Sequence, residues 1–376
     1  MQQAHEPPSA GRSGKPKASR YNSQEALSGW LMAAPVVLLL LVFLIVPFLF
    51  AFGLSFTNQR LISPNPTEFV GMSNFKSLLT VRPFMLDPER EPGTNTLVRN
   101  EEGAIVYPRL RDFTRNNPDY PQLDGLREWK MWQVGDRQLV LLASDTTFLQ
   151  ALANTVLFVI IVSPLQAGLA LLLALLINQP LRGINIFRTI YFMPVVISLV
   201  VVSLLWRFIY DGQDGLLNSL LGFITFGNFK PVDWLGNPST ALGSVMAMSI
   251  WQAVGFHMVI WLSGLQTIPF VLYEAASISG ANGLQKFRYV TWPGLRNTAV
   301  LILVVITMQA FGLFTQIDVM TKGGPLDSTQ SIVYQAVQRG YGKQDIAGGS
   351  AISVLLFVFV LAISLVQRFV TRERQS

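Results

Sequence analysis

The residue types that most enzymatic chemistry needs are scarce in this sequence of 376 residues. It has no cysteine, which excludes a thiolate nucleophile, a disulfide and a cysteine metal site. Its only histidines are His5 and His257, too few for an HExxH pair or a histidine-rich metal site. No nucleophile–base pair can be recognised. We therefore expect a protein that is not an enzyme and that binds no metal and no cofactor of its own.

Nucleotide binding and ion coupling also lack their usual residues. The string nearest to a P-loop, residues 340–344 (GYGKQ), has neither the spacing nor the hydroxyl of GxxxxGK[ST]. Asp318 is the one carboxylate placed in an expected membrane helix, near its outer end. His257 could relay protons, although a lone histidine in an apolar helix is more often a packed polar side chain. The energy for any transport is therefore expected to come from a partner.

The composition is that of a polytopic helical membrane protein. Hydrophobic residues make up 51% of the chain and charged residues 13%, with a mean hydropathy of +0.41, whereas soluble domains carry about 25% charged residues. Several runs without charge reach about 20 residues, the length of a helix that spans a bilayer. The net charge of +6 is explained by basic cytoplasmic loops and says little about nucleic acid.

These apolar runs predict an all-α fold with six membrane helices. A disordered basic tail at residues 1–27 precedes the first helix, which lies within residues 28–55, and the positive-inside rule then places both termini in the cytoplasm. The helical core covers residues 148–372. The spans are expected at about residues 30–54, 151–177, 190–210, 241–267, 297–318 and 349–370.

A long polar segment, residues 56–147, separates the first two helices. It is rich in Pro, Asn, Asp and Arg and has short alternating patches such as Gln138–Leu142. We expect it to be extracytoplasmic and to have a mixed, partly β structure, because long translocated loops escape the positive-inside bias.

The loop at residues 268–295 has a pattern of its own between the fourth and fifth apolar runs. Pro269 suits the first turn of a short helix, and Gly280 and Gly283 are expected to break it. A second short helix should then present Leu284, Phe287 and Val290 on one side, until Pro293 stops it. This is either a surface that docks another protein or an ordinary amphipathic interfacial loop.

The segment Glu274-Ala275-Ala276…Gly280-Ala281…Pro293 resembles the EAA motif of the permease subunits of importer-type ATP-binding-cassette (ABC) transporters. Its form is nearest to the maltose-type carbohydrate permease family. Other segments, spread over about residues 25–372, agree in family order: residues 69–75 (FVGMSNF), 187–189 (FRT) with Pro194, 250–269 (IWQ…GF…GLQ…IP), 321–329 (TKGGP…ST) and 351–355 (AISVL).

The sequence departs from the family pattern at three places. Ser279 stands where the family usually has Asp before the glycine of the loop. Trp292 precedes Pro293, at a position where the family commonly has an aliphatic residue. The larger departure is an insertion at about residues 81–144, which we interpret as an elaboration on the extracytoplasmic side. Ser279 is expected to weaken one contact between the loop and its partner without removing it.

The resemblance implies a type I ABC importer permease in the bacterial inner (plasma) membrane. Its implied partners are a second homologous permease chain, two ATPase subunits that bind ATP and Mg, and an extracytoplasmic solute-binding protein that delivers a sugar. Coupling to the ATPase would fall to the loop residues that match the motif: Glu274, Ala275, Ala276, Ser279, Gly280 and Ala281.

A sugar path in a membrane needs aromatic faces together with amide and hydroxyl groups. By family position it would lie around residues 251–256 and 306–313, so the predicted path residues are Trp251, Gln252, Phe256, Thr307, Gln309, Leu313 and Gln316. Each polar member could instead bridge two helices, which stabilises a membrane protein by about 0.6 kcal/mol. The scarcity of charge favours a neutral solute.

Two other functions stay open on the sequence alone. One is a self-sufficient secondary carrier or channel for a small neutral solute, driven by an ion gradient. The other is a membrane-embedded receptor or scaffold whose extracytoplasmic insertion is the functional part. Transport by the single chain without an ATPase would favour the carrier.

Overall fold

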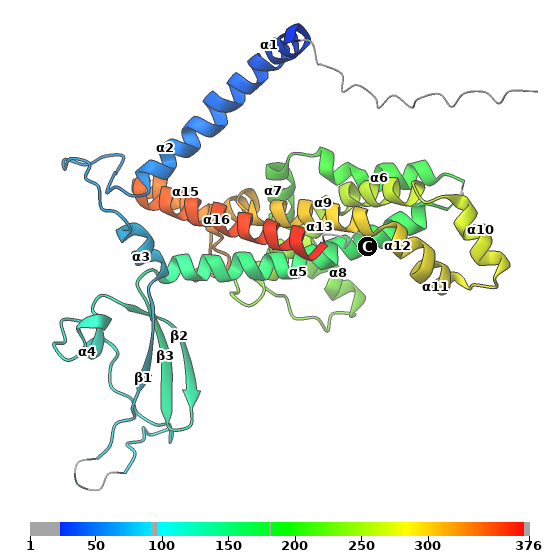
Figure 1. The fold of residues 1–376 in the computed structure, drawn as a ribbon. Coiled ribbons are helices and arrows are strands. Elements are labelled where there is room, and N and C mark those ends of the chain that lie inside the picture. The colour runs from blue at the N-terminus through cyan, green and yellow to red at the C-terminus, as the bar shows by residue number, and fades with distance from the viewer. Residues whose placement is uncertain (1–22, 92, 94–95, 180–181, 372–376) are drawn as a thin grey trace, which may run out of the picture. The chain divides into compact units, whose positions relative to one another are not determined.

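A computed structural model describes residues 23–91, 93, 96–179 and 182–371 (Figure 1). The chain divides into two units, residues 1–50 and 51–376, which are treated separately below. Most of the tail expected at residues 1–27 lies outside the described residues, and helix α1 already begins at Ser23.

The first unit is an apolar helix. It is built from α1 (Ser23–Leu40), a π-helical turn η1 (Leu41–Ile45) and the start of α2 (Val46–Leu54). The π turn comes just before Pro47, and membrane helices accommodate prolines by such local adjustments. Residues 30–50 carry no charge, which suits a helix that spans a bilayer.

Long helices that pack side by side form the core of the second unit (Figure 1). Helix α5 (Thr146–Ile177) lies against α9 (Ala241–Gln266) and α13 (Arg296–Phe311), and α13 also contacts α16 (Ile346–Thr371). Among the described residues, four helices are long and apolar enough to cross a membrane, and two bent pairs raise the number to six if each pair is one span. This agrees with the predicted number of spans.

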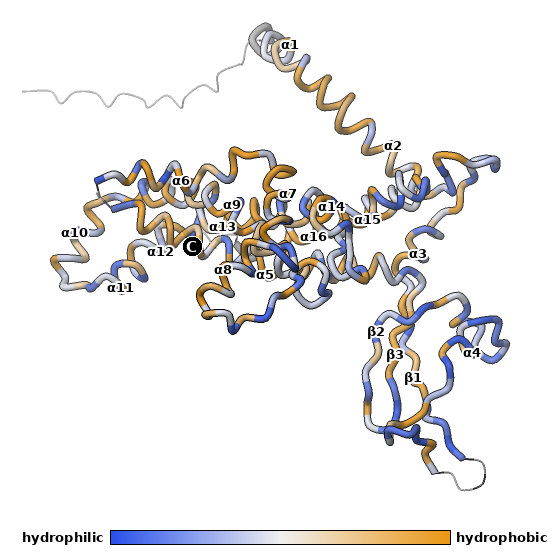
Figure 2. Tube along the Cα trace, turned by 180° about the vertical axis from the view of Figure 1, so that it is seen from behind, coloured by the Kyte–Doolittle hydropathy of each residue, from blue (hydrophilic) through white to orange (hydrophobic). Residues whose placement is uncertain are grey.

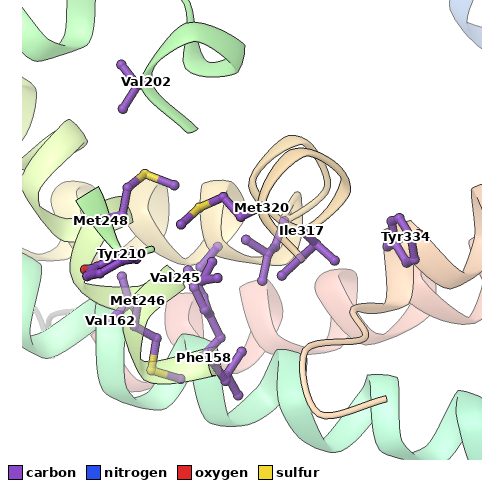
Figure 3. Packing of buried hydrophobic residues seen from close by; sticks show 13 residues of the cluster. Phe158, Val162, Val202, Tyr210, Val245, Met246, Met248, Ile317, Met320 and Tyr334 are labelled. Carbon is purple, nitrogen blue, oxygen red and sulfur yellow. The ribbon is translucent and has the colours of Figure 1, made fainter. Parts of the chain in front are cut away.

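Small residues on α5 let α9 approach closely. Ala167, Ala170 and Ala174 follow one another at helical spacing and are buried with Trp261. The Trp261 indole Nε1–H donates to the Ala167 carbonyl at 3.0 Å. A second cluster lies further along the same helices, and Figure 3 shows side chains of α5, α9 and α14 (Thr315–Met320) pointing toward one another there.

The third predicted helix is broken rather than continuous, so the expectation of one helix over residues 190–210 is wrong. The chain forms α6 (Ile184–Val196) and α7 (Leu199–Ile209), which are bent by 98°. Pro194 removes one hydrogen-bond donor near the end of α6. Ile197 and Ser198 then take extended ψ angles of 140° and 132° and change the direction of the chain.

The fifth predicted helix, residues 297–318, is also interrupted. Helix α13 ends at Phe311 and α14 begins at Thr315, so Gly312 lies at the break. The expected loops on either side of these spans contain further helices that the sequence reading missed, namely α8 (Leu216–Ile224), α15 (Ile332–Val337) and the π-helical η4 (Gln338–Gly342).

The polar insertion contains a small antiparallel sheet, as its alternating patches indicated. After the short α3 (Ser73–Leu79), strands β1 (Val81–Leu86), β2 (Arg127–Val134) and β3 (Arg137–Ala143) pair in the order β1-β3-β2. The connection between β1 and β2 carries α4 (Arg111–Thr114) and a 3-10 turn η2 (Pro121–Leu123). Residues 81–144 are called the insertion subdomain below.

Arg339 joins the insertion subdomain's exit to the helical core. Its Nη1 lies 2.7 Å from Asp145 Oδ2 and its Nε lies 2.8 Å from Asp345 Oδ2, with about a fifth of each side chain exposed. Asp145 also caps α5 by accepting from Phe148 N, and Asp345 accepts from Gly348 N in α16. One guanidinium therefore fixes the starts of two core helices.

The two views agree on the arrangement within residues 51–376. The sheet lies at one end of the long helices, and the loop at residues 268–295 lies at the other end (Figures 1 and 2). Apolar residues run along the helices, whereas polar residues gather in the insertion subdomain (Figure 2).

Candidate functional site

The loop at residues 268–295 folds into two short helices with a sharp turn between them. Helix α10 (Phe270–Ile278) is followed by Gly280 with a φ of +75°, a conformation that favours glycine. Gly280 N–H donates to the Ser277 carbonyl and Ala281 N–H to the Ala276 carbonyl at 2.9 Å, as in a Schellman motif. The expected break at Gly280 is confirmed.

The second helix of the loop differs from the prediction at both ends. Helix α11 (Gly283–Lys286) begins at Gly283, which is not a breaker, because Asn282 and Gln285 form a reciprocal capping box before it. The helical path then continues through the π turn η3 (Phe287–Thr291) and α12 (Trp292–Gly294). The path passes Pro293 and ends one residue later, at Gly294. The chain bends by 68° where α12 meets α13.

A hydrogen bond joins the two parts of the loop, and most of its surface is exposed. Tyr273 Oη and Thr291 Oγ1 lie 3.0 Å apart and join α10 to η3. Of the residues predicted to couple, Ala276 and Ala281 are half-buried and the other four (Glu274, Ala275, Ser279 and Gly280) are exposed. Glu274 forms no ion pair with any described residue. An apolar surface with an unpaired carboxylate, held in one shape, suits docking to another protein.

A cavity of about 500 Å³ lies between the core helices. Three helices each contribute one face to it, because the lining residues recur at a spacing of three or four. From α5 these are Phe158, Val162 and Gln166; from α9, Ser249, Gln252, Ala253 and Phe256; from α13, Ile306, Gln309 and Ala310. The remaining wall is Val195, Leu199, Gly312, Thr315 and Gln316.

That remaining wall is formed at the two helix breaks. Val195 and Leu199 flank the α6–α7 bend, and Gly312 and Thr315 flank the α13–α14 interruption. Irregular backbone at membrane depth is tolerated where it lines a cavity and is a feature of transporter binding sites. The breaks that contradict the continuous-helix prediction therefore shape this site.

The polar groups of the cavity are uncharged. They are four carboxamides and two hydroxyls, and no lining side chain is ionised. The carboxamides of Gln252, Gln309 and Gln316 make no hydrogen bond to any other described residue, so both ends of each can bind a ligand. Such a set matches hydroxyl groups, which both donate and accept.

The Gln166 carboxamide forms a hydrogen bond with His257. Its Nε2 lies 2.9 Å from His257 Nδ1, which is also 2.9 Å from the Ala253 carbonyl, and the imidazole is fully buried. The sequence favours a packed role for His257, and in the structure Gln166 is its partner. The ring limits the Gln166 carboxamide to few orientations toward the cavity.

The structure brings four predicted path residues together and separates three. Gln252, Phe256, Gln309 and Gln316 line the cavity. Trp251 does not, because its ring packs edge-on against Trp206 with centroids 5.4 Å apart. Two others are also outside the lining: Thr307 accepts from Gln367 Nε2 at 3.1 Å, and Leu313 is buried in the core. The path role of all seven stays a prediction.

Three polar lining residues were missed on the sequence: Gln166, Ser249 and Thr315. Gln166 carried a usable signal, since it follows Phe158 and Val162 at intervals of four in an otherwise apolar helix. Ser249 lies one turn before Gln252 on the same face of α9. Thr315 carried none, because its position depends on the break that precedes α14.

Comparison with known proteins decides the class of the chain. Residues 166–375 match the family "Binding-protein-dependent transport system inner membrane component". The chain belongs to this family. The matched region contains the loop at residues 268–295, most of the cavity and the two broken helices. The permease is thus a multi-pass inner-membrane component of an ABC transporter. Such a component is a transport subunit.

Relatives and solved structures agree with this assignment. The permease is 35% identical to a "Probable ABC transporter permease protein YurN" of Bacillus subtilis over 62% of its own length and 80% of that protein. It is 29% identical to the "Trehalose/maltose transport system permease protein MalF" of Thermococcus litoralis over 95% and 98% of the two chains. A bacterial ABC transporter involved in alginate import has the same fold, with a TM-score of 0.67, 18% identity, and coverage of 94% and 99%. The type I importer permease fold is confirmed.

Proposed function

We propose that this permease forms half of the translocation path of an ATP-driven sugar importer. The observation that carries the proposal is the cavity of uncharged carboxamides at the two helix breaks. Free amide groups and an aromatic face, Phe256, suit a neutral polyhydroxylated solute. The Thermococcus litoralis relative, named for trehalose and maltose transport, supports the same solute class.

A second permease chain would supply the other half of the path. Two ATPase subunits would bind ATP and Mg, and an extracytoplasmic solute-binding protein would deliver the sugar. The termini would be cytoplasmic, which the placement of the coupling loop and the insertion subdomain at opposite ends supports (Figure 1).

The coupling loop connects directly to two walls of the cavity. Residues 267–269 join it to α9, and Leu295 joins it to α13. Because Tyr273 and Thr291 hold its parts together, a push on α10 would move the loop as one body. Such a displacement would shift α9 and α13 together, which changes the shape of the cavity between them.

Uptake by the reconstituted transporter tests the proposal. Gln309→Ala and Gln252→Ala, which remove free carboxamides, should each weaken sugar uptake at low concentration by about 10-fold, since a hydrogen bond contributes roughly 1 kcal/mol and unpaired substrate groups add to the loss. Trp251→Ala is the matched control on α9 outside the cavity. Equal losses for Trp251→Ala and Gln252→Ala would contradict the assigned site.

Coupling is tested separately from binding. Glu274→Ala and Gly280→Val should leave solute binding intact and lower transport per ATP hydrolysed, because one removes the exposed carboxylate and the other strains a φ of +75°. Transport by this chain alone, driven by an ion gradient without ATPase subunits, would refute the importer assignment in favour of a secondary carrier.

A further inference from the structure

The insertion subdomain contains a second cavity, remote from the membrane path. Its volume is about 840 Å³, within the range of sites that hold small organic ligands. Four of its lining residues are arginines: Arg109, Arg111, Arg115 and Arg127. Glu128 is the one carboxylate among the lining residues, so the cavity carries a net positive charge.

The four guanidinium groups form no ion pair with any described residue. The ion pairs of the described residues involve Arg137 and Arg339, and none of the cavity arginines. The subdomain as a whole is not basic, since residues 81–144 hold nine basic and ten acidic side chains. The positive charges are therefore gathered in one place, which raises the local concentration of anions.

The cavity has a firm base. Leu126 and Leu142 belong to the buried core of the sheet and also line the cavity, as does the buried Thr114. Two hydrogen bonds hold the loops on either side: Gly125 N–H donates to the Thr114 carbonyl at 3.1 Å, and Asn116 N–H donates to Oδ1 of the Asp124 side chain at 3.0 Å. The segments that carry the arginines are thus fixed before any ligand arrives.

Strand β2 adds an irregularity beside the cavity. Its pairing with β3 shifts between Glu128 and Lys130, one residue after Arg127 begins the strand. Bulges redirect neighbouring side chains and are common next to binding sites. Arg127 and Glu128 both line the cavity although neighbours on a regular strand point to opposite faces.

We propose that this arginine cavity binds a small organic polyanion, one that carries two or more carboxylate or phosphate groups. Guanidinium groups bind both kinds of group through paired N–H donors. Leu110, which is half-buried and also lines the cavity, would contact the carbon skeleton. The site is distinct from the cavity between the core helices, called the carboxamide cavity below. The proposal holds whichever solute crosses the membrane.

Binding to the full chain in neutral-lipid nanodiscs tests this, measured by calorimetry with three probes: trigalacturonate, pyrophosphate and uncharged maltotriose. Trigalacturonate or pyrophosphate should bind, and maltotriose should neither bind at this site nor compete. A preference between the two anions identifies a uronic-acid oligosaccharide or a phosphate compound as the natural source. Binding of neither anion, or competition by maltotriose, would overturn the proposal.

Arg115→Gln/Arg127→Gln should weaken anion binding about 10-fold or more, the loss expected for two partly exposed charge-assisted contacts. Arg60→Gln/Arg82→Gln is the control, because it removes the same charge from exposed sites outside the cavity and should change binding less than about twofold. An equal loss in both variants would show a diffuse charge effect and refute the site. The unmodified chain gives an independent check, since its affinity must fall as NaCl rises.

Discussion

Arg339 should hold the starts of α5 and α16 together, and replacing it by Gln should loosen both. The change removes two charge-assisted contacts of 2.7 and 2.8 Å. Contacts to charged groups contribute about 1.5–3 kcal/mol each, and breaking a fully buried pair costs about 3–5 kcal/mol. Asp145 and Asp345 keep their backbone donors Phe148 N and Gly348 N, so we expect a loss of about 2–3 kcal/mol.

Hydrogen exchange of the full chain in nanodiscs measures this loss locally. A loss of about 2–3 kcal/mol corresponds to amide protection that falls by about 30- to 160-fold at residues 143–148 and 345–349, if they open together. Arg137→Gln is the matched control, because its ion pair with Asp87 is more than half exposed and contributes little. Protection that changes less than twofold in Arg339→Gln, or equally in both variants, would refute this reasoning.

Three further changes probe the helical core and the coupling loop. Gly255→Val should disrupt assembly of the helices, because a Cβ there would lie 1.9 Å from a backbone oxygen of α6. Gly243→Val, whose Cβ meets open space, should assemble normally. Size-exclusion chromatography distinguishes the two variants. Tyr273→Phe removes the link between α10 and η3, costs about 1 kcal/mol, and should lower transport per ATP; an unchanged ratio would contradict a rigid loop. His257→Leu frees the Gln166 carboxamide and should weaken sugar uptake at low concentration several-fold; rescue by His257→Asn would show that the lost hydrogen bond is responsible.

Span positions could be predicted from the sequence because they depend on a local property. A charge-free run must be buried in lipid or protein wherever it lies, so α5, α9 and α16 begin and end within a few residues of the expected bounds. The turn at Gly280 was predictable for the same reason, since one residue's steric freedom decides it.

The helix breaks were not predictable in this way. Hydropathy stays high across Ile197 and Ser198, and a proline in a membrane helix is compatible with a mild kink as well as with a bend of 98°. Which occurs depends on the neighbouring helices. The same dependence applies to Trp251, because composition identifies an aromatic side chain but not whether it faces the cavity or Trp206.

The uncharged lining of the carboxamide cavity has an electrical consequence. Moving one elementary charge through a membrane potential of 100 mV involves about 2.3 kcal/mol. The cavity walls of this chain carry no ionised side chain, so their movement together with a neutral solute displaces no charge along the membrane normal. For a neutral solute, the residues that line the cavity should therefore contribute nothing to any voltage dependence of turnover.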